Sequence, residues 1–159
     1  MNSKAKGNRF ELKIAKALTD VLGVKFHRVP CSGGMHWADD SRVTGDIVPP
    51  VGYDWPYSIE CKDRVAALDV HALLSGTSPL FDWYRQAEED ASRSSGIGCP
   101  VVVFNVPRKG IYCAMMEEDV PICGGPKISV PYLRGERRER LWIMSFYDWL
   151  EAVAEEQKI

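Results

Sequence analysis

The sequence predicts an α/β fold in which a central mixed β-sheet is flanked by helices. Apolar residues recur at helical spacing between Gly7 and Leu22, a pattern typical of an amphipathic helix. The continuous apolar run Val101–Val106 is typical of a strand that is buried on both faces of a sheet. The predicted order of elements is a helix, three strands, a helix and a strand, and then mostly strands before a final helix. This order indicates a mixed sheet covered by helices.

Local signals define the elements of the first half of the chain. The first helix is expected to end at Gly23, because glycine readily adopts the left-handed conformation of a helix C-terminus. Val24–Pro30 alternates as a strand does, and Asp46–Val48 and Tyr57–Lys62 are expected to form two further strands. The turn-rich segment Pro49–Pro56 between these two predicts a β-hairpin that brings them side by side.

Similar signals define the second half. Ser78 before Pro79 is typical of a helix N-cap followed by proline at the first helical position, and this helix is expected to run to Ser95. The remaining expected elements are three strands at Gly110–Met116, Lys127–Tyr132 and Leu141–Met144, and a final helix at Phe146–Glu156.

The bulk properties predict a single domain that spans residues 1–159. Hydrophobic residues make up 45% of the chain and the net charge is −2, so a DNA-binding surface must come from local clusters of basic residues. The five cysteines are scattered without disulfide or zinc spacing. No stretch is apolar enough for a membrane span and no signal peptide is apparent, so we expect a soluble, cytoplasmic protein. Residues 1–6 are a candidate flexible basic arm, and residues 65–78 are a candidate lid or insertion.

A carboxylate and an ammonium on one predicted strand can carry chemistry. Residues two apart in a strand face the same side, so Glu60 and Lys62 project together, while Ile59 and Cys61 point to the opposite side. With Asp46 across the predicted hairpin, two carboxylates can converge on Mg2+, which prefers few carboxylates together with water and phosphate oxygens. Such a metal site suits phosphodiester hydrolysis. A plain surface ion pair is the alternative interpretation of the motif.

Four sequence segments together resemble the PD-(D/E)XK nuclease superfamily, and their order and spacing are most similar to those of archaeal-type Holliday-junction resolvases. The segments are Lys6–Glu11, His27–Gly34, Gly45–Val48 and Ile59–Lys62. The resemblance implies a restriction-endonuclease-like core and a structure-selective endonuclease that cuts four-way DNA junctions by paired symmetric nicks. It also implies a homodimer that requires Mg2+, for which Mn2+ can substitute, and no small-molecule cofactor.

The resemblance further implies roles for individual residues. Lys62 would position the attacking water, and Ser32 stands where the resolvases have a catalytic serine. The implied metal ligands are Asp46, Glu60, the backbone carbonyl of Cys61, and Glu11 on the first helix. Basic residues that flank these motifs are candidates for phosphate contacts, namely Lys4, Lys6, Arg9, Arg28 and Arg64.

Several features depart from the family or leave alternatives open. Gly45 stands where the family usually has proline, and Val65–Ser78 is longer than the matching region of small resolvases. Gln86 is a candidate for a glutamine near the active site, with a solvated helix residue as the alternative. The basic run Arg134–Arg140 could contact a DNA arm, but its interleaved glutamates favour a solvated turn. A restriction-type or repair endonuclease on duplex DNA, or a catalytically idle DNA-binding module, are the alternative functions.

Overall fold

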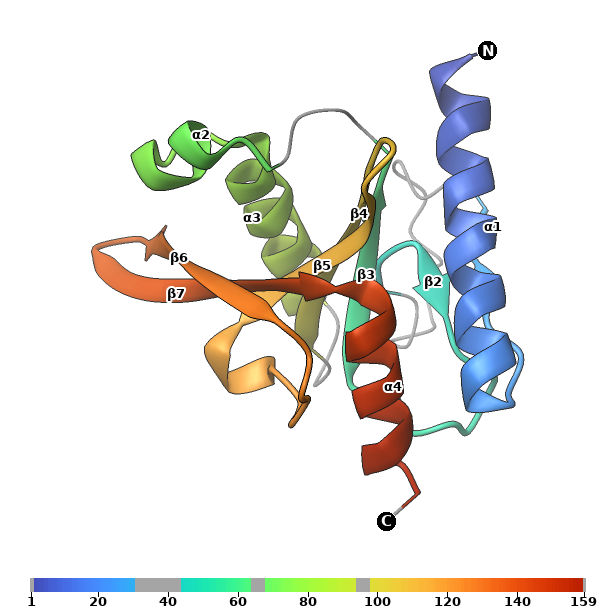
Figure 1. The fold of residues 1–159 in the computed structure, drawn as a ribbon. Helices are drawn as coiled ribbons and strands as arrows, with labels where there is room; N and C mark the ends of the chain where they lie inside the picture. The colour runs from blue at the N-terminus through green and yellow to red at the C-terminus, as the bar shows by residue number, and fades with distance from the viewer. Residues whose placement is uncertain (1, 31–43, 64–67, 94–97, 159) are drawn as a thin grey trace.

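A five-stranded mixed sheet forms the centre of the molecule, with helices on both of its faces (Figure 1). The computed structural model describes residues 2–30, 44–63, 68–93 and 98–158. The helices are α1 (Ser3–Leu22), α2 (Val70–Ser75), α3 (Pro79–Ser92), the 3-10 turn η1 (Glu117–Asp119) and α4 (Phe146–Glu156). The strands are β1 (His27–Arg28), β2 (Ile47–Val48), β3 (Tyr57–Lys62), β4 (Cys99–Val106), β5 (Gly110–Met116), β6 (Lys127–Arg134) and β7 (Arg137–Ser145).

The strand order in the sheet is β3-β4-β5-β7-β6. β3 and β4 are parallel and are connected through α3, whereas the other neighbouring strands are antiparallel. α1 and α4 pack on one face of the sheet and α3 packs on the other. The predicted fold class, a mixed sheet flanked by helices, is therefore confirmed, and β4 lies inside the sheet as its apolar sequence predicted.

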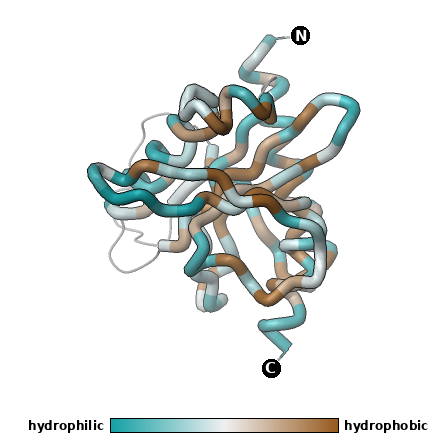
Figure 2. Tube along the Cα trace, turned by 60° about the vertical axis from the view of Figure 1, so that its left-hand side comes forward, coloured by the Kyte–Doolittle hydropathy of each residue, from teal (hydrophilic) through white to brown (hydrophobic). Residues whose placement is uncertain are grey.

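Each face of the sheet is covered by its own hydrophobic cluster. Apolar segments lie mostly in the strands at the centre of the molecule, whereas the outer turns are hydrophilic (Figure 2). Strand alternation divides β3 between the two faces. Ile59 and Cys61 join the cluster beneath α1 and α4, whereas Lys62 contacts α3 through Gln86. Burial of a side chain such as Ile59 stabilises the fold by about 1.5–3 kcal/mol. Because Ile59 must face this cluster, the alternate residues Glu60 and Lys62 face the other side of β3.

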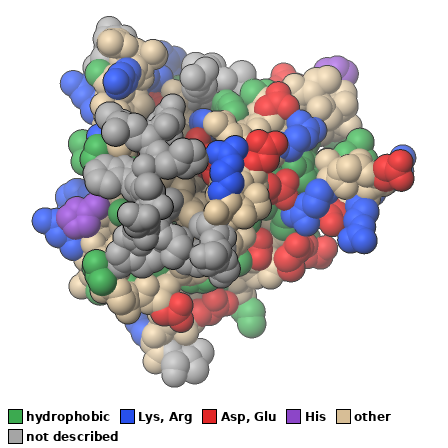
Figure 3. All heavy atoms as spheres, turned by 180° about the vertical axis from the view of Figure 1, so that it is seen from behind, with side chains coloured by type: hydrophobic (Ala, Val, Ile, Leu, Met, Phe, Trp, Pro, Cys, Tyr) green, Lys and Arg blue, Asp and Glu red, His purple; other side chains and the backbone are tan. Residues whose placement is uncertain are grey.

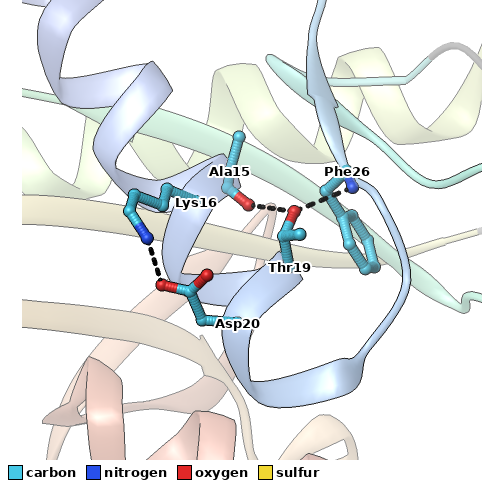
Figure 4. A network of polar contacts seen from close by, with 5 residues as sticks. All are labelled: Ala15, Lys16, Thr19, Asp20 and Phe26. Atoms are coloured by element: carbon cyan, nitrogen blue, oxygen red, sulfur yellow. Dashed lines mark hydrogen bonds and ion pairs between the residues drawn. The ribbon is translucent and has the colours of Figure 1, made fainter.

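The C-terminal end of α1 is tied to the segment that follows it through Thr19 (Figure 4). The Thr19 hydroxyl donates to the Ala15 carbonyl at 2.8 Å and accepts the Phe26 N–H at 3.0 Å. Gly23 ends the helix in the left-handed conformation, with φ +72°, as predicted. These contacts turn the chain back so that β1 runs beside α1.

The segment around Asp46 pairs differently from the predicted hairpin, which was wrong. β2 is antiparallel to β1 and does not form a hairpin with β3. Gly45, just before β2, forms a parallel bridge with Ile59 of β3. The physical reason lies in the connection 49–56, whose three prolines have no N–H for a strand ladder. This connection is long enough to bring the chain back in the parallel direction.

Other expectations differ from the structure in smaller ways. Within the candidate flexible arm 1–6, residues 3–6 form the first turn of α1, which the side chain of Asn2 caps. Within the candidate lid 65–78, α2 packs against β6, while residues 65–67 lie outside the described ranges. The run 134–140 joins β6 and β7 as the end of a hairpin. Among the described residues, no helix is long and apolar enough to cross a membrane.

Candidate active site

Four of the predicted catalytic residues lie close together at the β3 edge of the sheet, namely Glu11, Asp46, Glu60 and Lys62. The Asp46 N–H donates to the Ile59 carbonyl at 2.7 Å, and the Asp46 carboxylate accepts the Cys61 N–H at 2.7 Å. Asp46 is therefore held against the strand by its backbone and its side chain, and it is only 4% exposed. The N–H and C=O of one strand residue point to the same edge, so the Cys61 carbonyl faces this edge as well.

Gly45 allows the chain to approach β3 this closely. Its φ is +71°, in the left-handed region that favours glycine. A Cβ on this residue would lie 2.2 Å from the carbonyl oxygen of Ile59. Proline, the usual residue of the family at this position, has a fixed negative φ and could not adopt this conformation. The departure from the family pattern is thus a requirement of this backbone, and it leaves Asp46 in place.

Glu60 and Lys62 form a mostly buried ion pair on the α3 side of the sheet. The Lys62 ammonium lies 2.8 Å from Glu60 Oε1 and donates to Gln86 Oε1 at 3.3 Å. The side chains of Glu60 and Lys62 are 12% and 18% exposed, so they do not form a plain surface ion pair. Gln86 was only an uncertain candidate on the sequence, because helical spacing does not reveal which sheet residue a helix faces.

Glu11 reaches the site from α1 and is held by Arg28 of β1. The Arg28 Nε atom lies 2.7 Å from Glu11 Oε2, and a second guanidinium nitrogen donates to Asn8 Oδ1 at 2.7 Å. The sequence indicated Arg28 only as a phosphate contact and gave no role to Asn8. The contact between Arg28 and Glu11 depends on the turn after α1, which brings these residues together although they are 17 positions apart in the sequence.

The carboxylates of the site influence one another's protonation. Burial, and then the negative charge of Asp46, raise the pKa of Glu60 to about 7, although Lys62 acts in the opposite direction. Burial also raises the pKa of Glu11; the hydrogen bond from Arg28 opposes this effect, and the charge of Asp46 adds to it. The neighbouring cations thus do not fully offset burial and mutual repulsion of the carboxylates. Such a site favours an additional cation.

The donor set fits a divalent metal ion such as Mg2+ or Mn2+. Mg2+ takes oxygen ligands and is commonly bound through one or two carboxylates together with water and phosphate oxygens. Asp46 and Glu60 supply two carboxylates, and the Cys61 carbonyl faces the same edge of the sheet. In the part of the chain that the structure describes, no three His, Cys, Asp or Glu side chains are grouped closely enough to hold a metal ion. The third carboxylate, Glu11, is instead turned toward Arg28.

The basic residues expected to contact phosphates lie mainly along the start of α1. Lys4 and Arg9 are exposed on this helix. The Lys6 ammonium lies 3.7 Å from a carboxylate oxygen of Asp63, just after β3, so this end of α1 is linked to the end of the active-site strand. Two of the predicted residues lie outside the described ranges, namely Ser32 and Arg64.

A comparison with known protein families gives a match over most of the chain. The model of a family described as "Phage putative PDDEXK endonuclease" matches residues 2–137, which include every predicted site residue. No curated protein matches the sequence. Among solved structures, the chain is similar to Hjc, a Holliday junction resolvase from the archaeal hyperthermophile Archaeoglobus fulgidus. The identity is 17% and the TM-score 0.43, with 93% of this chain and 99% of that chain covered.

Proposed function

Because the chain belongs to this phage PDDEXK endonuclease family, we propose that it is a metal-dependent DNA endonuclease that resolves four-way junctions. The observation that carries the proposal is the arrangement at the β3 edge, where the buried carboxylates of Asp46 and Glu60 lie next to the Lys62 ammonium. Burial of two repelling carboxylates is costly. A bound metal ion that uses both of them would offset this cost.

Each site residue has a proposed role in phosphodiester hydrolysis. The proposed metal ligands are Asp46, Glu60, the backbone carbonyl of Cys61, and Glu11 in support. When bound, a divalent cation neutralises charge that develops on the phosphate and makes water more acidic. Lys62 is held between Glu60 and Gln86, so its ammonium is fixed where it can orient a water molecule and stabilise a negatively charged transition state.

The proposed substrate is branched DNA and the proposed active form is a homodimer. The support is the motif order over residues 3–64, which is most similar to that of archaeal-type resolvases. Two symmetric cuts require two sites related by a two-fold axis, which a homodimer provides. Lys4, Lys6 and Arg9 stand on the exposed start of α1 and would contact phosphates, which fix position without reading sequence. Ser32 would contact the scissile phosphate, as the resemblance implies.

Cleavage of a labelled four-way junction and of a matched linear duplex tests the proposal. Each substrate is incubated with Mg2+ or with EDTA, and with wild type, Glu60→Ala or Glu89→Ala. Glu89 is an exposed residue of α3, so its substitution controls for the loss of a carboxylate outside the site. We expect paired symmetric nicks in the junction with wild type and Glu89→Ala, and no nicks with EDTA or with Glu60→Ala.

Other outcomes would discard separate parts of the proposal. Equal cutting of the duplex would retain the nuclease and discard junction selectivity, in favour of a restriction-type or repair enzyme. Binding of either DNA without cutting in Mg2+ or Mn2+ would favour the idle DNA-binding module.

A further inference from the structure

The β6–β7 hairpin separates its charged residues by face, although they are interleaved in the sequence. Alternate residues of a strand point to opposite faces. On β7, Leu141 belongs to the cluster beneath α3 and Met144 to the cluster beneath α4. Counting back by twos from these residues places Glu139 on the α3 face and both Arg138 and Arg140 on the opposite face. Residues 134–138 are exposed, as the prediction of a solvated turn requires, but the strands separate the charges by face.

On the α3 face, Arg134 is paired with glutamates. Arg134 lies 2.5 Å from Glu88 of α3, 3.2 Å from Glu139 and 4.0 Å from Glu118. Figure 3, which views the molecule from behind, shows acidic and basic side chains intermixed on this side. This face is therefore close to electrically neutral and presents no concentrated positive charge.

The opposite face of the hairpin carries three charged residues on its strands, all of them basic, beside uncharged residues such as Ser129 and Leu133. We call it the hairpin outer face and define it by Lys127, Arg138 and Arg140. Lys127 shares this face because it pairs with Met144 across the hairpin. All three side chains are exposed, and Arg138 makes no ion pair with any described residue.

The Arg140 guanidinium is already held in position. It donates to the hydroxyl of Ser129 at 2.8 Å and to the Ser129 carbonyl at 3.3 Å, which leaves further N–H groups to donate outward. The hairpin extends well beyond α4, on the side of the molecule away from α1 (Figure 1). The outer face is thus a projecting surface whose cations make no ion pair with a described carboxylate, although Lys127 donates to the Cys123 carbonyl at 3.2 Å.

We propose that the hairpin outer face binds the phosphate backbone of duplex DNA away from the cleaved position. This rests on the proposed function only in taking DNA as the partner. Guanidinium groups suit phosphate because their forked N–H donors match its oxygens. β6 lies four strand positions from β3. Glu60 and Lys62 lie on the α3 side of the sheet and the hairpin outer face lies on the opposite side, so a duplex bound there contacts the protein away from the cleaved position.

The test compares substitutions on the two faces of one strand. Arg138→Gln and Arg137→Gln remove the same charge from adjacent exposed residues, but only Arg138 lies on the outer face. Binding of a fluorescent 30-base-pair duplex is measured by anisotropy across salt concentrations, in EDTA so that no cleavage occurs. We expect Arg138→Gln to weaken binding roughly tenfold near 0.1 M salt and to reduce the salt slope by about 0.9. Addition of Arg140→Gln should produce a second step of similar size, and Arg137→Gln should change little.

Two results would overturn the proposal. Equal losses for Arg137→Gln and Arg138→Gln would indicate a general effect of net charge, and unchanged binding in the Arg138→Gln, Arg140→Gln double variant would exclude the contact. Cleavage by the same preparations in Mg2+ separates this proposal from the proposed function. Wild type that cuts DNA while the hairpin variants bind normally refutes the hairpin contact alone. Wild type that binds through the hairpin but cuts no DNA refutes the nuclease alone.

Discussion

Substitution of Glu60 by glutamine should stabilise the metal-free protein at neutral and alkaline pH. The pKa of Glu60 rises from its ordinary value of 4.5 to about 7 in the folded protein, because burial and the charge of Asp46 disfavour its ionised form. Between these two pH values the folded state binds a proton that the unfolded state releases, so the free energy of unfolding falls as pH rises. This pKa shift lowers the free energy of unfolding by about 3 kcal/mol once Glu60 is ionised. The loss is absent below the lower pKa and complete above the higher one.

Urea unfolding in EDTA at pH values from 4 to 8 measures this effect. Glu60→Gln removes the ionisable group while retaining most of its shape, so its stability should not fall through this window as that of wild type does. The difference in unfolding free energy between variant and wild type should grow by about 3 kcal/mol from pH 4 to pH 8. The ion pair with Lys62 needs no separate correction, because its effect is already part of the pKa of about 7. Glu89→Gln, an exposed change, is the matched control and should show no such growth.

The reasoning would be refuted if the unfolding free energies of Glu60→Gln and wild type ran parallel across this pH range. Mg2+ provides a second comparison. It should stabilise wild type above pH 7, where Glu60 is ionised, and should stabilise Glu60→Gln much less, because ligand binding stabilises only the state that binds.

Three further substitutions test other parts of the structure. Gly45→Ala should lower the free energy of unfolding by about 2 kcal/mol or more, because of the positive φ and the contact with the Ile59 carbonyl; a thermal melt that matches wild type would contradict the described backbone. Arg28→Ala removes the hydrogen bond that lowers the pKa of Glu11, so the pH-rate profile of cleavage should move to higher pH and metal affinity should fall about tenfold; an unchanged profile and affinity would show that Arg28 does not position Glu11. Thr19→Val should cost about 1–3 kcal/mol in chemical denaturation, because a buried N–H loses its acceptor; cleavage per folded molecule should stay the same, and a loss of activity without a loss of stability would contradict this role.

The sequence predicted the elements whose signals are local. Gly23 and Pro79 mark a helix end and a helix start that depend only on neighbouring residues, and the structure has both. The apolar run of β4 is equally local, because a strand buried on both faces has no polar positions to place.

Pairing between distant segments was harder to predict. We predicted an antiparallel hairpin between the segments of Asp46 and Glu60, and this direction was wrong. The two residues nevertheless lie at one edge of the sheet, because Gly45 forms a parallel bridge with β3. The Glu11–Arg28 contact left no signal in the sequence, since it depends on how tightly the chain turns after α1. Charge separation on the β6–β7 hairpin became visible only once strand register was known.

The attachment of Asp46 to β3 has a consequence for how the protein behaves in a crowded solution. β3 is the edge strand of the sheet, and an open edge offers unpaired N–H and C=O groups to any strand of another molecule. Asp46 occupies two of these groups, the Ile59 carbonyl and the Cys61 N–H. Asp46, a proposed metal ligand, therefore also blocks part of this edge against pairing with a strand of another molecule. A variant that lacks the Asp46 carboxylate would expose the Cys61 N–H, whereas the backbone bond to the Ile59 carbonyl would remain.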